Sequence, residues 1–121
     1  MVKFRATVFW VDDVWREDEI RMFEDLFEKK GLLAIIINSG DVAKREIQNG
    51  LKYDLLIADF ASPYFEGYYI IKMSKELNPE VPTLAYSNKD FICEEADIVL
   101  PKFCGLKKFF ETIDILLARS R

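Results

Sequence analysis

The apolar residues of this chain gather into five short runs separated by longer mixed segments. The runs cover residues 6–11, 32–37, 55–58, 81–86 and 98–100, and several are apolar at consecutive positions. Strands that are buried on both faces have this pattern, whereas strands with one wet face alternate between apolar and polar residues. We therefore predict five parallel strands that are covered by helices on both sides.

The segments between most of these runs have the periodicity of amphipathic helices. Gly31 follows the first predicted helix as a left-handed cap, and either Ser39 or Asp41 can cap the second, which closes near Gly50. The first, third and last helices are predicted over residues 16–30, 66–77 and 106–119. Strands and helices in alternation, joined by right-handed crossovers, give one doubly wound α/β domain over residues 1–121, with its ligand site at the carboxyl ends of the strands.

Composition narrows the possible functions. The chain has 121 residues with 21 acidic and 17 basic side chains, a formal net charge of −4, which does not favour nucleic acid as a partner. The sequence has no signal peptide and no apolar run near the ~20 residues of a membrane helix, so a cytoplasmic location without membrane contact is expected. It also has no histidine, which excludes histidine-based catalysis and the commonest zinc ligand.

Five polar residues stand at the ends of four predicted strands. Asp12 and Asp13 follow the first strand, Asp59 the third, Ser87 the fourth and Lys102 the fifth. An Asp after a strand is most often a helix cap or a turn former. Capping does not require a lysine and a hydroxyl at the same edge of the sheet, however, so the combination indicates a chemical site.

These residue types suit phosphoryl transfer. Crowded carboxylates repel one another unless a hard divalent cation lies among them, and Mg²⁺ needs only one or two direct carboxylates. Phosphoryl transfer needs a metal, a second cation and an in-line nucleophile. Asp59 can attack, Lys102 can pair with the transferred group, and Ser87 can hydrogen-bond to a phosphoryl oxygen.

Over nearly its whole length the sequence resembles the receiver domains of two-component response regulators of the chemotaxis-regulator kind. The matching positions are the acidic pair Asp12-Asp13, the phosphoacceptor Asp59, the hydroxyl residue Ser87, the lysine Lys102 and the loop residues Pro63 and Gly67. The resemblance implies a flavodoxin-like sheet of strand order 2-1-3-4-5 with helices on both faces.

The resemblance also implies a ligand set and a partner. Asp13, Asp59 and the backbone carbonyl of Ala61 would contact Mg²⁺, and Asp12 would act mostly through water. The phosphoryl donor would be a histidine kinase, a phosphotransfer protein or a small acyl phosphate. The chain would assist its own phosphorylation and dephosphorylation but would not be an enzyme that turns over a separate metabolite.

The sequence departs from the family at three places. Lys102 comes fifteen positions after Ser87, about two helical turns sooner than in typical receivers, so the fourth helix should be shortened or absent. Another chain, such as a second copy in a homodimer, or a repositioned loop should then cover this face of the sheet. Val99 stands where the family has its switch aromatic, and Phe103 stands where a proline often follows the lysine.

Three functions compete. We expect a stand-alone receiver without an output domain, which signals through a downstream protein and not through direct binding to DNA. The alternative is a docking or dimerisation module that works without phosphorylation, and the altered fourth-helix region favours it. A small phosphatase with an aspartyl nucleophile is disfavoured, because Phe60 and Ala61 follow Asp59 and no second Asp stands two residues on.

Overall fold

Strands and helices alternate along most of the chain in the computed structural model, which describes residues 3–12, 16–59, 67–87 and 93–119. The strands are β1 (Ala6–Val11), β2 (Leu32–Ile37), β3 (Leu55–Asp59), β4 (Thr83–Ser87) and β5 (Ile98–Pro101). The helices are α1 (Glu17–Lys29), α2 (Gly40–Gln48), α3 (Gly67–Leu77) and α4 (Leu106–Arg119), and a short 3₁₀ helix, η1 (Lys102–Cys104), joins β5 to α4. Within these residues no helix is long and apolar enough to cross a membrane.

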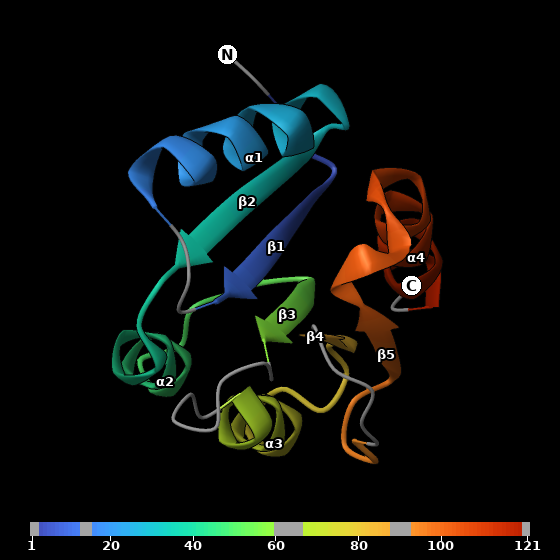
Figure 1. The fold of residues 1–121 in the computed structure, drawn as a ribbon. Coiled ribbons are helices and arrows are strands. Elements are labelled where there is room, and N and C mark those ends of the chain that lie inside the picture. The colour runs from blue at the N-terminus through green and yellow to red at the C-terminus, as the bar shows by residue number, and fades with distance from the viewer. Residues whose placement is uncertain (1–2, 13–15, 60–66, 88–92, 120–121) are drawn as a thin grey trace.

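The five strands form one parallel sheet in the order β2-β1-β3-β4-β5. Helices α1 and α4 lie on one face of the sheet, and α2 and α3 lie on the other (Figure 1). This arrangement confirms the predicted doubly wound, flavodoxin-like fold with both faces covered. Burial on both faces explains the continuous apolar runs, as predicted, since all five residues of β3 and all five of β4 are buried.

Local signals at the helix ends act as predicted. Gly31 has a φ of +76°, a conformation that costs a glycine little, and it follows α1. Ser39 caps α2, because its hydroxyl accepts a hydrogen bond of 3.3 Å from the backbone N–H of Val42. The fourth strand begins two residues later than predicted, at Thr83, and extends to include Ser87.

The connection from β4 to β5 differs from the other crossovers. Residues 93–97 form turns and no helix, and residues 88–92 lie outside the described part of the chain. Cys93 is buried and Ala96 half-buried, and both pack into the core on the α2/α3 side. For the described residues, the shortened connection confirms the prediction of an altered fourth helix, and a loop of the same chain covers part of the sheet.

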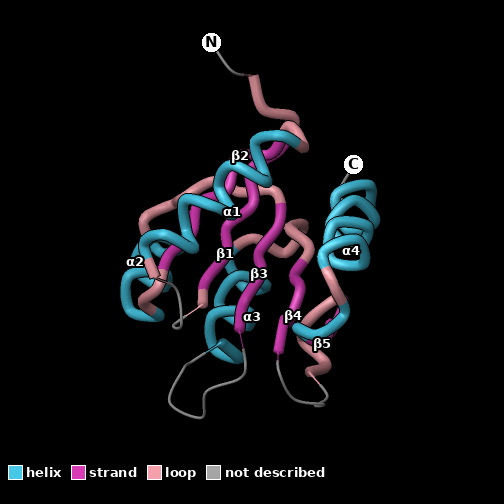
Figure 2. The backbone as a smooth tube through the Cα atoms, turned by 45° about the horizontal axis from the view of Figure 1, so that its top comes forward, coloured by secondary structure: helices cyan, strands magenta, loops and turns pink. Residues whose placement is uncertain are grey.

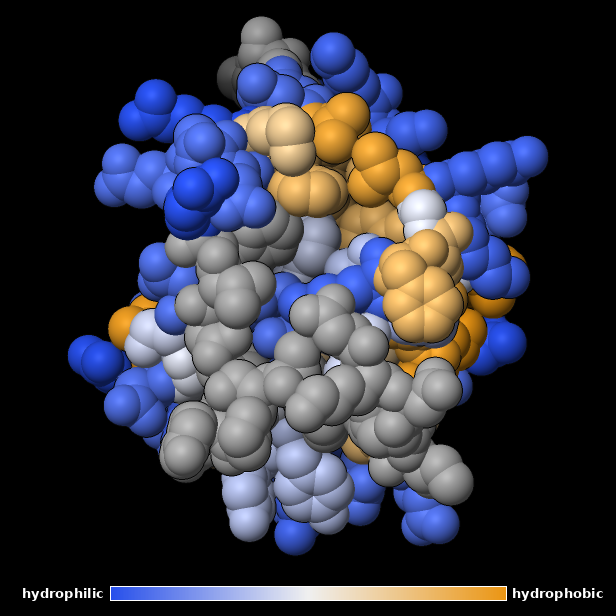
Figure 3. All heavy atoms as spheres, viewed as in Figure 1, coloured by the Kyte–Doolittle hydropathy of each residue, from blue (hydrophilic) through white to orange (hydrophobic). Residues whose placement is uncertain are grey.

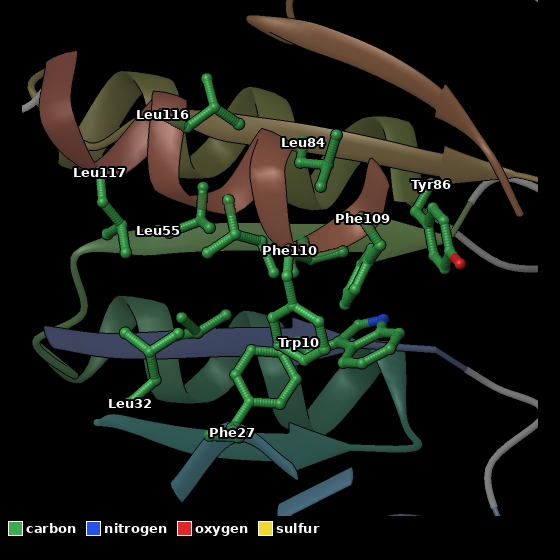
Figure 4. Close-up of a cluster of buried hydrophobic side chains, with 14 of the residues drawn as sticks. Trp10, Phe27, Leu32, Leu55, Leu84, Tyr86, Phe109, Phe110, Leu116 and Leu117 are labelled. Atoms are coloured by element: carbon green, nitrogen blue, oxygen red, sulfur yellow. The ribbon is translucent and has the colours of Figure 1, made fainter. Parts of the chain in front are cut away.

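The core on the α1/α4 side is rich in aromatic residues (Figure 4). Trp10 of β1 is only 2% exposed and lies at its centre. Its ring centroid is 5.8 Å from that of Phe27 on α1, 5.1 Å from that of Phe109 on α4 and 5.9 Å from that of Tyr86 on β4. Side chains from two strands and two helices thus meet around one indole, close to the carboxyl end of the sheet.

Candidate functional site

Four of the five predicted site residues come to the carboxyl edge of the sheet. Asp12 directly follows β1, where its backbone N–H donates to the carbonyl of Ile37, 3.1 Å away. Asp59 and Ser87 are the last residues of β3 and β4, and Lys102 is the first residue after β5. Because all the strands are parallel, these ends lie along one edge (Figure 2).

Lys102 joins two carboxylates that stand at the ends of different strands. Its Nζ lies 2.7 Å from Oδ2 of Asp12 and 3.2 Å from Oδ1 of Asp59. The Asp12 and Asp59 side chains are 3% and 0% exposed, and that of Lys102 is 16% exposed. Two carboxylates facing one ammonium leave a formal charge of −1, in surroundings where charge is poorly screened.

Ser87 lies beside this group on the adjoining strand. In the sheet register Asp59 is opposite Tyr86, and Ser87 follows one position further toward the same edge. Ser87 is fully buried. Its position suits a hydroxyl that hydrogen-bonds to a group held on Asp59.

Several residues that the sequence analysis singled out lie outside the described part of the chain. These are Asp13, Ala61 and Pro63. The predicted contacts of Asp13 and of the Ala61 carbonyl with a metal therefore remain predictions.

The donor atoms at the site fit Mg²⁺. Among the described residues no group of three His, Cys, Asp or Glu side chains gathers, and the acidic groups at this edge are Asp12 and Asp59. Mg²⁺ uses one or two carboxylates and keeps several waters, so a pair of buried carboxylates with excess negative charge suits it.

Tyr86 is a component of the site that sequence reasoning did not identify. Its hydroxyl donates to the backbone carbonyl of Lys102 across 3.3 Å, and the Lys102 Nζ lies 5.8 Å from the centre of its ring. Burial, with smaller contributions from the neighbouring Cys104 and Asp12, raises the pKa of Tyr86 to about 12. The only sequence signal was an aromatic residue directly before Ser87, in a strand whose successive side chains point to opposite faces.

The two departures after β4 have clear places in the structure. Val99 packs, half-buried, on the α2/α3 side of the sheet, opposite Ala85 of β4. Phe103 lies in η1 and is 78% exposed, and the described residues contain no cis peptide bond.

Apolar surface gathers between α1 and α4, where Leu26, Leu106 and Phe110 line a groove (Figure 3).

Comparison with known proteins identifies the fold. No protein-family model and no curated protein sequence matches the chain. Among solved structures, the receiver domain of a Francisella response regulator is 24% identical, with a TM-score of 0.78 over 97% of this chain and 100% of that one. The N-terminal domain of a response regulator/sensory box/GGDEF protein from Carboxydothermus hydrogenoformans is 15% identical, with a TM-score of 0.76 over 93% and 94%.

A third neighbour was solved with ligands. The response regulator TrrA from Thermotoga maritima, in complex with Mg²⁺ and beryllofluoride, is 20% identical, with a TM-score of 0.74 over 91% of this chain and 97% of that one. The sheet order, the carboxyl-edge site and these likenesses lead to one conclusion. The chain has the fold of a response-regulator receiver domain.

Proposed function

We propose that this chain accepts a phosphoryl group on Asp59. The observation that supports the proposal best is the contact of Lys102 with both Asp12 and Asp59, since it gathers a nucleophile, a second acid and a cation from three separate parts of the chain. A buried ion pair of this kind is costly to maintain and adds little to stability by itself. Its cost is understandable if these groups serve chemistry.

The chain would use Mg²⁺. As the sequence resemblance implies, Asp13, Asp59 and the backbone carbonyl of Ala61 would hold it, and Asp12 would act mostly through water. The bound ion would neutralise charge on the phosphoryl oxygens during transfer. The Thermotoga neighbour, which contains Mg²⁺ and beryllofluoride, supports this assignment by analogy.

The transfer itself would proceed at Asp59. A carboxylate oxygen of Asp59 attacks phosphorus while the bond from phosphorus to the donor's imidazole nitrogen breaks, and the electron pair of that bond stays on the imidazole. The ammonium of Lys102 then pairs with a phosphoryl oxygen, and the hydroxyl of Ser87 donates to another. Attack of water on phosphorus later releases phosphate and returns Asp59 as a carboxylate.

These 121 residues contain no histidine, so a phosphohistidine donor would lie outside them. A phosphohistidine on a kinase or phosphotransfer protein, or a small acyl phosphate, would supply the group. The output would be a changed affinity for a downstream protein.

Mass spectrometry after incubation with acetyl phosphate and Mg²⁺ tests the proposal. The expected product is the chain with one added phosphoryl group, formed by the wild type and by Asp41→Asn but not by Asp59→Asn. Asp41 is a suitable control because its carboxylate lies in the first turn of α2 and is 88% exposed. Equal phosphorylation of wild type and Asp59→Asn would place the acceptor elsewhere, and no phosphorylation of the wild type would contradict the proposal.

The second candidate function is docking of a second copy without phosphorylation. The lack of a helix in the described residues between β4 and β5 favours it, since residues 93–97 form turns where the other crossovers have helices. Sedimentation of wild type and Asp59→Asn without a phosphoryl donor separates the candidates. A dimer formed equally by both proteins would support docking, and a monomer in both would contradict it.

A further inference from the structure

Tyr86 touches both the phosphoacceptor site and the aromatic core. We infer that Tyr86 is a positioning residue, which holds Lys102 over the two carboxylates and transmits the state of the site to the aromatic cluster beneath α1 and α4. This inference rests on the proposed function, because it concerns the lysine that would bind the phosphoryl group.

Two contacts at different ends of Lys102 restrain it. The Tyr86 hydroxyl donates to the Lys102 carbonyl and so fixes the first peptide of η1. The Tyr86 ring lies 5.8 Å from the Lys102 ammonium, within the distance at which a cation is attracted to an aromatic face. Backbone and side chain of the lysine are thereby held by one residue, which is only 9% exposed.

The hydroxyl remains a donor under all ordinary conditions. Burial and the nearby Cys104 and Asp12 raise the pKa of Tyr86 to about 12, so that the phenol stays protonated near neutral pH. A neutral donor tethers the carbonyl without adding charge to a site that already has an excess of carboxylates.

The same ring belongs to the aromatic cluster. Its centroid is 4.8 Å from that of Phe109 on α4 and 5.9 Å from that of Trp10 (Figure 4). The Trp10 centroid is in turn 5.2 Å from that of Phe23 on α1. A movement of Lys102 toward a phosphoryl group would weaken its contacts with Tyr86. The ring would then adjust against Phe109 and Trp10, because close-packed aromatic rings have no free space in which to move alone.

The opposite face offers no comparable residue on β5. Val99 packs among the residues of the α2/α3 side, and it is aliphatic. The structure therefore favours a connection from the site to α1 and α4.

The decisive test compares two ligands of the same site. Lys102 pairs with Asp12, so it competes with Mg²⁺ but assists binding of beryllofluoride, which imitates a phosphoryl group. Tyr86→Phe removes only the hydroxyl, and we expect the Kd of beryllofluoride at saturating Mg²⁺ to rise about 3–10-fold, the usual effect of one lost hydrogen bond. The Kd of Mg²⁺ alone should stay the same or fall.

Tyr53→Phe is the matched control. The Tyr53 hydroxyl is also buried, but it bonds to Ser74 at 2.7 Å and to Asn78 at 2.9 Å in the α2/α3 half of the molecule. The variant should therefore lose stability without changing either Kd. Equal weakening of both ligands in Tyr86→Phe, or an unchanged Kd of beryllofluoride, would overturn the positioning role.

The indole N–H resonance of Trp10 tests the transmission. Trp15→Phe assigns the two tryptophan resonances, and beryllofluoride should shift that of Trp10 in the wild type but much less in Tyr86→Leu. An equal shift in Tyr86→Leu would overturn the route through the ring. If the wild type binds neither Mg²⁺ nor beryllofluoride, the proposed function itself fails, which is a separate result from a Tyr86 variant that binds normally.

Discussion

Lys102 neutralises part of the charge of two carboxylates that are almost fully buried. Replacing it with alanine removes the ammonium that lies 2.7 Å from Asp12 and 3.2 Å from Asp59. Breaking a buried ion pair by removing one partner costs about 3 kcal/mol or more. A divalent cation can replace the lost charge, so Mg²⁺ should stabilise Lys102→Ala more than it stabilises the wild type.

Urea unfolding with and without Mg²⁺ measures this difference. Lys75→Ala is the control, because Lys75 forms an ion pair with Asp97 and not with the carboxylates of the site. Mg²⁺ should change the stability of this variant by the same amount as that of the wild type. An equal gain from Mg²⁺ in Lys102→Ala and wild type would show that the lysine and the metal do not share the carboxylates.

The ionisation of Tyr86 should make the stability of the protein depend on pH in the alkaline range. Because the folded pKa of about 12 lies above the ordinary value of 10.0, Tyr86 contributes stability that is complete below pH 10 and is lost as pH rises through the folded pKa. Tyr86→Phe cannot ionise, so the stability gap between it and wild type should narrow above pH 10. Urea unfolding from pH 9 to 11.5 provides the measurement, and a gap that widens in this range would contradict the assignment.

The residues of the site differ in how far they could be predicted. Asp12, Asp59, Ser87 and Lys102 were identified because the ends of parallel strands share an edge, a consequence of topology alone. The role of Tyr86 could not be predicted, because it depends on the path of η1, which returns the Lys102 carbonyl to the tyrosine hydroxyl. No periodic pattern specifies a turn of three residues.

At the level of elements, the edge strand β5 depends on Asp97. Its carboxylate accepts from the backbone N–H of Thr83 at 2.7 Å and from Lys75 of α3, and its own N–H donates to the Thr83 carbonyl at 3.0 Å. Partial burial would raise the pKa of Asp97, but the hydrogen bonds from Lys75 and Thr83 outweigh it and lower the pKa below 3.8. One side chain thus fastens the start of β5 to β4 and α3.

Asp97→Ala should cost about 1–3 kcal/mol at pH 7, because the Thr83 N–H loses its acceptor. The depressed pKa means that the charge on Asp97 stabilises the fold above pH 3.8 and that this contribution is lost as pH falls through the folded pKa. The gap between wild type and variant should therefore shrink toward pH 3. Urea unfolding at both pH values measures this gap, with the exposed Asp41→Ala as control. A gap that stayed the same at pH 7 and pH 3 would contradict this account.

The elements themselves were largely predictable, for reasons of burial. Continuous apolar runs located all five strands, and the apolar stripe from Leu106 to Leu117 located the last helix. The start of β4 was predicted too early, since Val81 and Pro82 are apolar but precede the first residue of the strand. Hydrophobicity marks buried residues, and buried residues continue into loops.

For the molecule as a whole, one sheet separates two cores. Ile113 of α4 and Ile71 of α3 are both fully buried, the first on the α1/α4 side and the second on the α2/α3 side. Ile→Val at either position should cost about 0.5–1.5 kcal/mol. Because the strands contribute side chains to both cores, we expect either substitution to lower a single cooperative transition.

Trp10 makes this testable, since its fluorescence reports on the α1/α4 side while circular dichroism reports on all helices. In a Trp15→Phe background both signals should give the same urea midpoint for wild type, Ile113→Val and Ile71→Val. A lower midpoint by circular dichroism alone in Ile71→Val would mean that the two faces unfold independently.

The contact between Lys102 and Asp12 joins positions that are 90 residues apart in the chain. A ribosome exposes Asp12 and Asp59 well before Lys102, so the growing chain has its acidic groups long before it has their counter-ion. If Lys102 is needed to receive the phosphoryl group, a prematurely terminated product would neither accept nor report a signal. The same contact that prepares the site would thus leave incomplete chains unable to accept a phosphoryl group.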